Sequence, residues 1–182
     1  MASEAPPYPR FEPGDHDAFM ELAIEEAKKS QPDPGKFAVG AVLVDADTGQ
    51  VLSSGFYLEY PDDYLGDVGS THAERSCFIK IAKAYGIPED RIHKVLPPNT
   101  AVYTTLEPCS ARPSGDTPCI SRILGLRSVV KTVYVGIRTP GASPARDYGK
   151  EALEAGGVSV IYPSEHLKDR ITEVSMAGGT KA

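Results

Sequence analysis

Three residues in the middle of the chain have the types and spacing of zinc ligands. His72 offers an imidazole, and Cys109 and Cys119 offer two thiolates. Zinc in proteins is usually four-coordinate, and three protein ligands with one open place are the pattern of catalytic rather than structural sites. The sequence therefore predicts a catalytic zinc (Zn2+) site whose fourth place is left for water.

Glu74 follows His72 by two residues and is not needed as a ligand. A carboxylate beside an activated water can carry protons to and from a reacting group. The alternative is an ordinary carboxylate in the first turn of a helix, where the helix dipole stabilises it. Because Glu74 comes so soon after a zinc ligand, we expect it to be the catalytic acid and base.

The two ligand cysteines are separated by a long segment of nine residues. Both can reach one metal ion if this segment is a surface loop and Cys119 begins a helix. Pro118 fits that interpretation, because proline is favoured at the start of a helix. A helix start also stabilises a thiolate through its dipole.

The composition limits the classes of protein that need to be considered. The chain has 182 residues, of which 41% are hydrophobic and 24% charged, which predicts one soluble globular domain with a substantial core. The net charge of −6 argues against a nucleic-acid-binding protein, whose partner would require a basic surface.

Cysteine usage and hydropathy predict where the protein is found. No apolar run resembles a signal peptide or a membrane-spanning helix, so we expect no membrane association. A reducing compartment follows, namely the cytoplasm, with the nucleus kept as an alternative, and thiols there more often serve metals or catalysis than disulfides. The third cysteine, Cys77, is expected to be a small buried apolar residue.

Hydrophobic periodicity and turn residues define the expected elements. Helices are predicted over 16–29, 72–85, 119–124, 145–155 and 164–175. Strands are predicted over 37–44, 51–57, 101–106, 132–137 and 158–162.

These elements predict a three-layer α/β/α fold around a five-stranded mixed sheet. The Asp47-Thr48-Gly49 turn makes the first two strands an antiparallel hairpin. The strand, helix and strand at the end of the chain imply a parallel pair joined by a right-handed crossover. We expect a loose arm over residues 1–14, the zinc-dependent domain over 15–176 and a tail over 177–182.

The motifs around the predicted site resemble those of the cytidine deaminase superfamily, and within it the deaminases of riboflavin biosynthesis. The resemblance runs from residue 36 to about residue 162, and its long inter-cysteine segment differs from the short spacing in tRNA adenosine and cytosine deaminases. The run before Cys119 looks most like the fungal deaminase domain. The matching pieces are Val39 to Val44, Thr71 to Glu74, Thr105 to Ser110, Thr117 to Cys119 and Val133 to Arg138.

This resemblance implies a cytidine-deaminase-like fold and a small phosphorylated pyrimidine as the substrate. The implied reaction converts 2,5-diamino-6-ribitylamino-4(3H)-pyrimidinone 5′-phosphate into 5-amino-6-ribitylaminouracil 5′-phosphate and ammonia. A homodimer is also expected from the resemblance.

Substrate contacts are expected at positions where the sequence departs from the bacterial members. Lys36 stands where the bacterial pattern has asparagine, Tyr57 where it has histidine, and Arg112 and Ser114 lie in a loop that there carries histidine and lysine. Lys36 and Arg112 are the candidates for the phosphate, since arginine can bind phosphate with two hydrogen bonds. Backbone groups near Ala73 are expected to orient the base.

Two other interpretations remain open. The first is a deaminase of cytosine, deoxycytidylate or tRNA adenosine, although the long inter-cysteine loop and the negative net charge argue against the tRNA enzyme. The second is a catalytically silent binding module that contains zinc. Glu74 speaks against that module, because a structural zinc site has no use for this carboxylate.

Overall fold

A computed structural model describes residues 8–31, 34–60, 71–112, 117–141 and 149–177. Its centre is a five-stranded sheet with the order β2-β1-β3-β4-β5. Strand β1 is antiparallel to both β2 and β3, whereas β3 with β4 and β4 with β5 are parallel. The strands are β1 (Gly40–Asp45), β2 (Gln50–Phe56), β3 (Thr100–Leu106), β4 (Val130–Ile137) and β5 (Ser159–Ile161).

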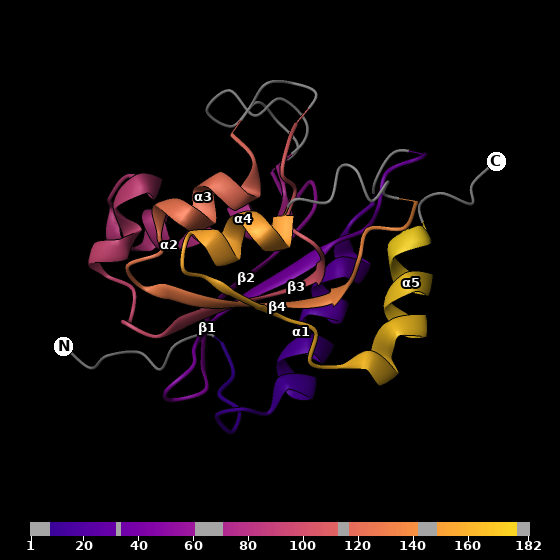
Figure 1. The fold of residues 1–182 in the computed structure, drawn as a ribbon, viewed down its shortest axis with the longest axis horizontal. Coiled ribbons are helices and arrows are strands. Elements are labelled where there is room, and N and C mark those ends of the chain that lie inside the picture. Colours follow the sequence, from indigo (N-terminus) through magenta and orange to yellow (C-terminus); the bar gives the residue numbers. More distant parts are fainter. Residues whose placement is uncertain (1–7, 32–33, 61–70, 113–116, 142–148, 178–182) are drawn as a thin grey trace.

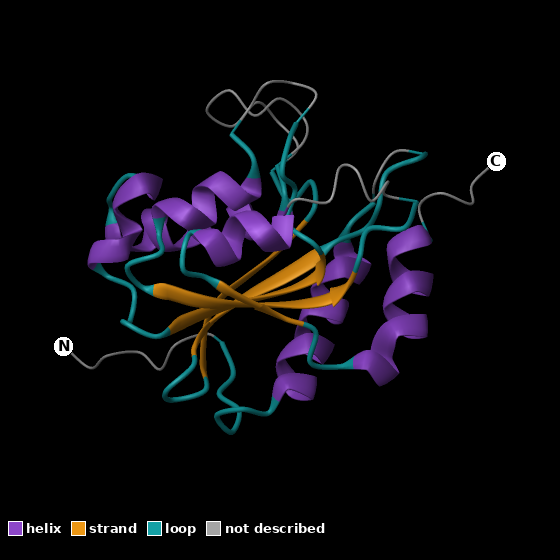
Figure 2. Ribbon diagram, in the orientation of Figure 1, coloured by secondary structure: helices purple, strands orange, loops and turns teal. Residues whose placement is uncertain are grey.

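Helices cover both faces of this sheet. Figures 1 and 2 show α2, α3 and α4 on one face and α1 and α5 on the other, which confirms the predicted three-layer α/β/α arrangement. The helices are α1 (His16–Lys29), α2 (Ala73–Tyr85), α3 (Cys119–Gly125), α4 (Gly149–Ala155) and α5 (Lys168–Met176), with the 3₁₀ helices η1 (Glu89–Lys94) and η3 (Glu165–Leu167).

Two hydrophobic cores fill the spaces between the layers. Alternate residues of a strand point to opposite faces of a sheet. In β3, Val102 therefore packs in the core under α2, α3 and α4, while Ala101 and Tyr103 pack in the core under α1 and α5. Cys77 is buried in the first of these cores, as the sequence predicted.

Most expected elements agree with the observed ones, but three places differ. The first strand, expected from residue 37, begins at Gly40. The segment between α2 and β3, expected to be an irregular connection because it is rich in proline, contains the 3₁₀ helix η1. The fully buried Ile92 packs η1 against the core. The last helix begins with a 3₁₀ turn, η3, before α5. The predicted start of the helix over 145–155 lies outside the described residues.

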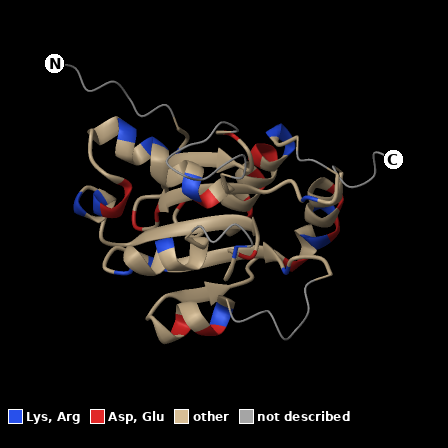
Figure 3. Ribbon diagram, turned by 90° about the horizontal axis from the view of Figure 1, so that it is seen from above, with Lys and Arg blue, Asp and Glu red and all other residues tan. Residues whose placement is uncertain are grey.

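Charged residues fall mainly on helices and loops, where both signs are interspersed (Figure 3). The helices of the described segments are all too short or too polar to cross a lipid bilayer.

The position of α2 on the sheet depends on Gly55. A Cβ atom at this position would lie 2.6 Å from Ser76 Cβ and 2.7 Å from the Ala73 carbonyl oxygen. We expect Gly55→Ala to lower the free energy of unfolding by about 1–3 kcal/mol, because α2 would have to move away from β2. Urea denaturation measures this change.

Gly125→Ala is the matched control, because nothing lies within 4 Å of a Cβ at Gly125. Its unfolding free energy should stay within about 0.5 kcal/mol of the parent value. Equal stability of the two variants would contradict the close approach of α2 to the sheet.

Candidate zinc and catalytic site

The sheet topology brings the three predicted zinc ligands to one edge. Strands β2 and β3 run in the same direction, because β1 lies antiparallel between them. Their carboxyl ends therefore meet at the same edge of the sheet. His72 is the N-cap of α2, Cys109 follows the end of β3, and Cys119 is the first residue of α3.

The ligand atoms are close enough to share one metal ion. Cys109 Sγ and Cys119 Sγ each lie 3.4 Å from His72 Nδ1, and the three ligand atoms all lie within 4.8 Å of one another. A tetrahedral zinc ion with ordinary Zn–N and Zn–S bonds would separate N and S by about 3.6 Å. One nitrogen and two sulfurs at this spacing therefore fit zinc.

The helix start assists the thiolates. The backbone N–H of Cys119 donates a hydrogen bond of 3.2 Å to Cys109 Sγ. Hydrogen bonding to Cys119 lowers the pKa of Cys109, and the same interaction raises the pKa of Cys119. Burial disfavours the charged form of His72, but interactions with Cys109 and the charge of Glu74 together outweigh this effect, so the pKa of His72 is raised. Cys109 is thus prepared to bind a cation as the thiolate.

Glu74 lies against the ligands and is only 3% exposed. Its Oε1 accepts a hydrogen bond of 3.3 Å from Thr104 Oγ1, and its Oε2 accepts one of 3.4 Å from Cys119 Sγ. Burial raises the pKa of Glu74, while the charge of His72 works in the opposite direction. A carboxyl group with a raised pKa beside a reaction centre is suited to carrying a proton.

The structure places the predicted substrate-binding residues at different distances from this site. The Tyr57 ring meets the His72 ring edge to face, with centroids 5.8 Å apart. Arg112 is half-buried, and its positive charge acts on His72 by lowering the pKa of that residue. Ala73 is fully buried at the start of α2. Lys36 is exposed in the segment before β1, and Ser114 lies outside the described residues.

Two polar residues of the site were missed by sequence reasoning. Thr104 binds Glu74, and Glu107 at the end of β3 accepts a hydrogen bond from the Tyr162 hydroxyl and lies 3.6 Å from Arg138 Nε. Thr104 is a fully buried polar residue in β3, a strand whose residues are all buried. That polarity was the available signal, because a buried hydroxyl requires a partner.

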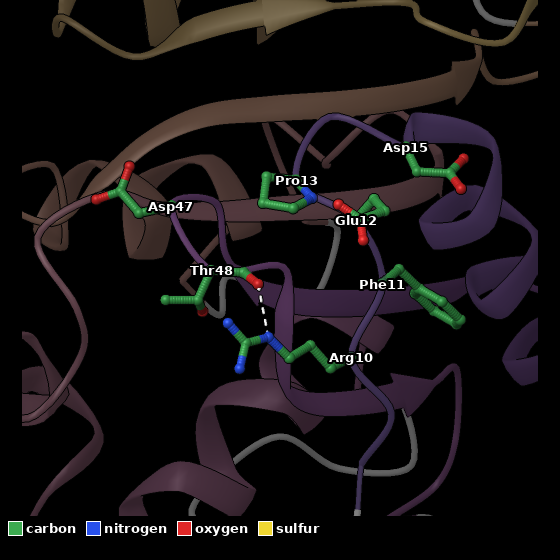
Figure 4. A pocket seen from close by; sticks show the side chains of 7 residues that line it. All are labelled: Arg10, Phe11, Glu12, Pro13, Asp15, Asp47 and Thr48. Carbon is green, nitrogen blue, oxygen red and sulfur yellow. Dashed lines mark hydrogen bonds between the residues drawn. The ribbon is translucent and has the colours of Figure 1, made fainter.

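The structure has two cavities whose described linings leave out the zinc ligands. One, of about 650 Å³, lies at the opposite edge of the sheet, beside the β1–β2 turn, where Arg10 Nε donates to the Thr48 carbonyl (Figure 4). The other, of about 430 Å³, lies between the end of β4 and α5 and is lined by Arg138, Tyr162 and Lys168 among others. Neither includes the ligands or Glu74 in its described lining. The second cavity nevertheless opens at the same edge of the sheet as the ligands, because β3 and β4 are parallel and Leu106 pairs with Ile137.

Comparison with known proteins places this geometry in a family. Residues 13–137 match the family model of the cytidine and deoxycytidylate deaminase zinc-binding region. The chain belongs to this deaminase family. The matched region includes His72, Glu74, Cys109 and Cys119, so the side chains that converge in the structure lie in the family's zinc-binding region.

Three relatives show which deaminases this chain is similar to. It is 31% identical to the diaminohydroxyphosphoribosylamino-pyrimidine deaminase of Schizosaccharomyces pombe, over 90% of the chain and 36% of that protein. The crystal structure of Aspergillus oryzae Rib2 deaminase in complex with DARIPP is 31% identical, with a TM-score of 0.76 over 91% of this chain and 92% of that one.

The third relative is bacterial. The diaminohydroxyphosphoribosylaminopyrimidine deaminase and 5-amino-6-(5-phosphoribosylamino)uracil reductase of Thermotoga maritima is 28% identical, with a TM-score of 0.65 over 90% of this chain and 40% of that one. The deaminase chain thus spans about a third of the yeast relative and two fifths of the bacterial one. These comparisons confirm the resemblance to deaminases of riboflavin biosynthesis and the cytidine-deaminase-like fold.

Proposed function

We propose that this chain is a zinc-dependent hydrolytic deaminase of riboflavin biosynthesis. Its substrate would be 2,5-diamino-6-ribitylamino-4(3H)-pyrimidinone 5′-phosphate, and its products 5-amino-6-ribitylaminouracil 5′-phosphate and ammonia. The observation that carries the proposal is the convergence of His72, Cys109 and Cys119 beside the buried carboxylate of Glu74. The similarity to the Aspergillus oryzae deaminase over nearly the whole of both chains supports the substrate class.

The residues of the site would divide the reaction between them. His72, Cys109 and Cys119 would hold zinc, which supplies Lewis-acid activation of a water molecule at neutral pH. Glu74 accepts a proton from the attacking water and returns protons to the ring nitrogen and the departing amine. Water thereby replaces the amine on the ring carbon, and ammonia leaves.

The substrate's polar groups would be bound by residues around the ligands. Arg112 and Lys36 are proposed for the phosphate, Tyr57 and Ser114 as further substrate contacts, and backbone groups near Ala73 and Cys109 for the base. Arg112 lies near enough to His72 for its charge to lower the pKa of that residue, which supports a place for Arg112 at the rim of the site.

Arg112→Ala is expected to raise KM about tenfold or more with a smaller change in kcat, because a charge-assisted hydrogen bond to phosphate contributes about 1.5–3 kcal/mol. Steady-state ammonia release measures both constants. Arg127→Ala is the control: Arg127 is exposed at the end of α3 and bonds the Leu124 carbonyl. If both variants keep the parent KM, Arg112 does not bind the phosphate.

Ammonia release by the purified zinc protein tests the substrate assignment. The ribitylamino pyrimidinone phosphate, its ribosylamino counterpart, cytosine and deoxycytidylate would be compared at equal concentration. Selective turnover of the ribityl compound is expected. Preference for the ribosyl compound would reverse the order of reduction and deamination, and turnover of cytosine or deoxycytidylate alone would replace the riboflavin-pathway assignment with another deaminase.

Assembly, location and boundaries complete the proposal. We propose a homodimer in the cytoplasm, with the nucleus as the alternative compartment, that acts on a small molecule and not on nucleic acid. The zinc-dependent domain is proposed to span residues 15–176, between an arm over 1–14 and a tail over 177–182. Within that arm, residues next to the hairpin contact it: Phe11 N–H bonds the Gly49 carbonyl. Light scattering on the purified protein tests the dimer.

A further inference from the structure

Glu89 lies between the two helices that begin at the proposed zinc ligands. Its Oε1 and Oε2 bind Arg75 of α2, at 3.1 Å from Nε and 3.2 Å from Nη2 respectively. Its Oε1 also lies 3.9 Å from Nη1 of Arg122 in α3. One carboxylate of η1 therefore joins α2 to α3.

The two arginines occupy equivalent places relative to the ligands. Arg75 follows His72 by three residues, and Arg122 follows Cys119 by three residues. Each arginine thus lies in or next to the first turn of its helix, and residues three apart on a helix are neighbours on its surface. By binding these two arginines, the Glu89 carboxylate is linked through one turn of α2 to His72 and through one turn of α3 to Cys119.

These ion pairs are largely shielded from water, which strengthens the attraction between their charges. The Arg75 side chain is 4% exposed and the Glu89 side chain 17%, and the Arg122 side chain is 21% exposed. The fully buried Ile92 fixes η1 in the core, so the carboxylate is presented from a rigid element. Without the negative charge, the buried Arg75 guanidinium would lose its ion pair with Glu89, and a neutral side chain would stand between the two cations.

We propose that Glu89 is a positioning residue of the zinc site. It holds the first turns of α2 and α3 at the separation that lets His72 and Cys119 bind the same ion, and it touches neither the ion nor the substrate. This inference rests on the zinc site of the proposed function and not on the substrate assigned there.

The test compares Glu89→Gln with a matched control. Glutamine keeps the size of the side chain and removes its charge. Glu26→Gln is the control, because the Glu26 side chain is 7% exposed and pairs with Lys29 at 2.7 Å in α1, on the other face of the sheet. Zinc affinity is measured by chelator competition, ligand geometry by the thiolate-to-metal absorption of the cobalt-substituted protein, and folding by thermal unfolding of the zinc-free protein.

Glu89→Gln is expected to weaken zinc binding about 10-fold to 100-fold, the range seen when residues supporting metal ligands are removed. The cobalt spectrum should shift, and Glu26→Gln should leave both readings unchanged. Zinc affinity within twofold of the parent, with an unchanged cobalt spectrum, would overturn the inference.

Arg122→Gln covers the case in which Glu89→Gln does not fold, because it removes the more exposed cation. It is expected to weaken zinc binding severalfold, and parental affinity in that variant would equally overturn the inference. These binding measurements use no substrate. Failure of the parent protein to deaminate any pyrimidine would therefore contradict the proposed function while the role of Glu89 stood or fell separately.

Discussion

Replacing Glu74 with glutamine is expected to lower kcat about 1,000-fold while zinc remains bound. A positioned acid and base contributes roughly 10²–10⁴-fold to a rate, and glutamine cannot exchange a proton. The amide keeps the size of the carboxylate and can still accept the Thr104 hydrogen bond. Ammonia release gives the rate, and metal analysis of the same sample gives the zinc content.

Thr104→Val serves as the control for this experiment, since it keeps the carboxylate and removes the hydroxyl that lies 3.3 Å from Glu74 Oε1 and 2.8 Å from the Leu106 carbonyl oxygen. We expect a loss of about tenfold or less, because a single neutral hydrogen bond contributes about 0.5–1.5 kcal/mol. Undiminished turnover by Glu74→Gln would show that another group carries the proton. Loss of zinc from that variant would mean that the carboxylate serves the metal site itself.

Cys109→Ser is expected to abolish stable zinc binding and with it the deaminase activity. Removing a residue that only supports a metal ligand commonly costs 10–100-fold in affinity, so removing a thiolate ligand should cost more than about 100-fold. Chelator competition measures the affinity, and thermal unfolding with and without zinc measures how much of the stability depends on the ion. Added zinc should no longer raise the melting temperature.

Cys77→Ala separates the loss of a ligand from the loss of a cysteine. Burial raises the pKa of the Cys77 thiol, and its Sγ lies 3.5 Å from the Ala41 carbonyl oxygen, in the core between α2 and the sheet. This variant should keep the parental zinc affinity and lose roughly 1 kcal/mol of stability, because it removes one small buried group. If Cys77→Ala released zinc as Cys109→Ser does, the choice of the two ligand cysteines would be wrong.

Local patterns were sufficient to predict most of the elements. Helix α1 was predicted with its observed bounds, because an aspartate cap at Asp15 and an apolar stripe define it and a turn follows it from Ser30. The β1–β2 hairpin was predicted from the Asp47-Thr48-Gly49 turn alone. The parallel pairing of β3 with β4 was not predicted, although α3 connects them in the same way as α4 connects β4 to β5.

The sequence by itself determined which chemistry is available. One imidazole and two thiols, with a carboxylate two residues beyond the imidazole, restrict the metal and its role whatever the fold. These are properties of residue types and short spacings, so they can be recognised before any contact between distant segments is known.

Only the tertiary structure decided how these groups meet. The strand order β2-β1-β3 brings the ends of β2 and β3 to one edge, and this places Cys109 beside His72 across 37 positions of sequence. The same packing buries Glu74 against Thr104 and lets Glu89 join Arg75 to Arg122. Such partners depend on distances between layers, and no local pattern encodes them because burial and ion pairing are properties of the assembled core.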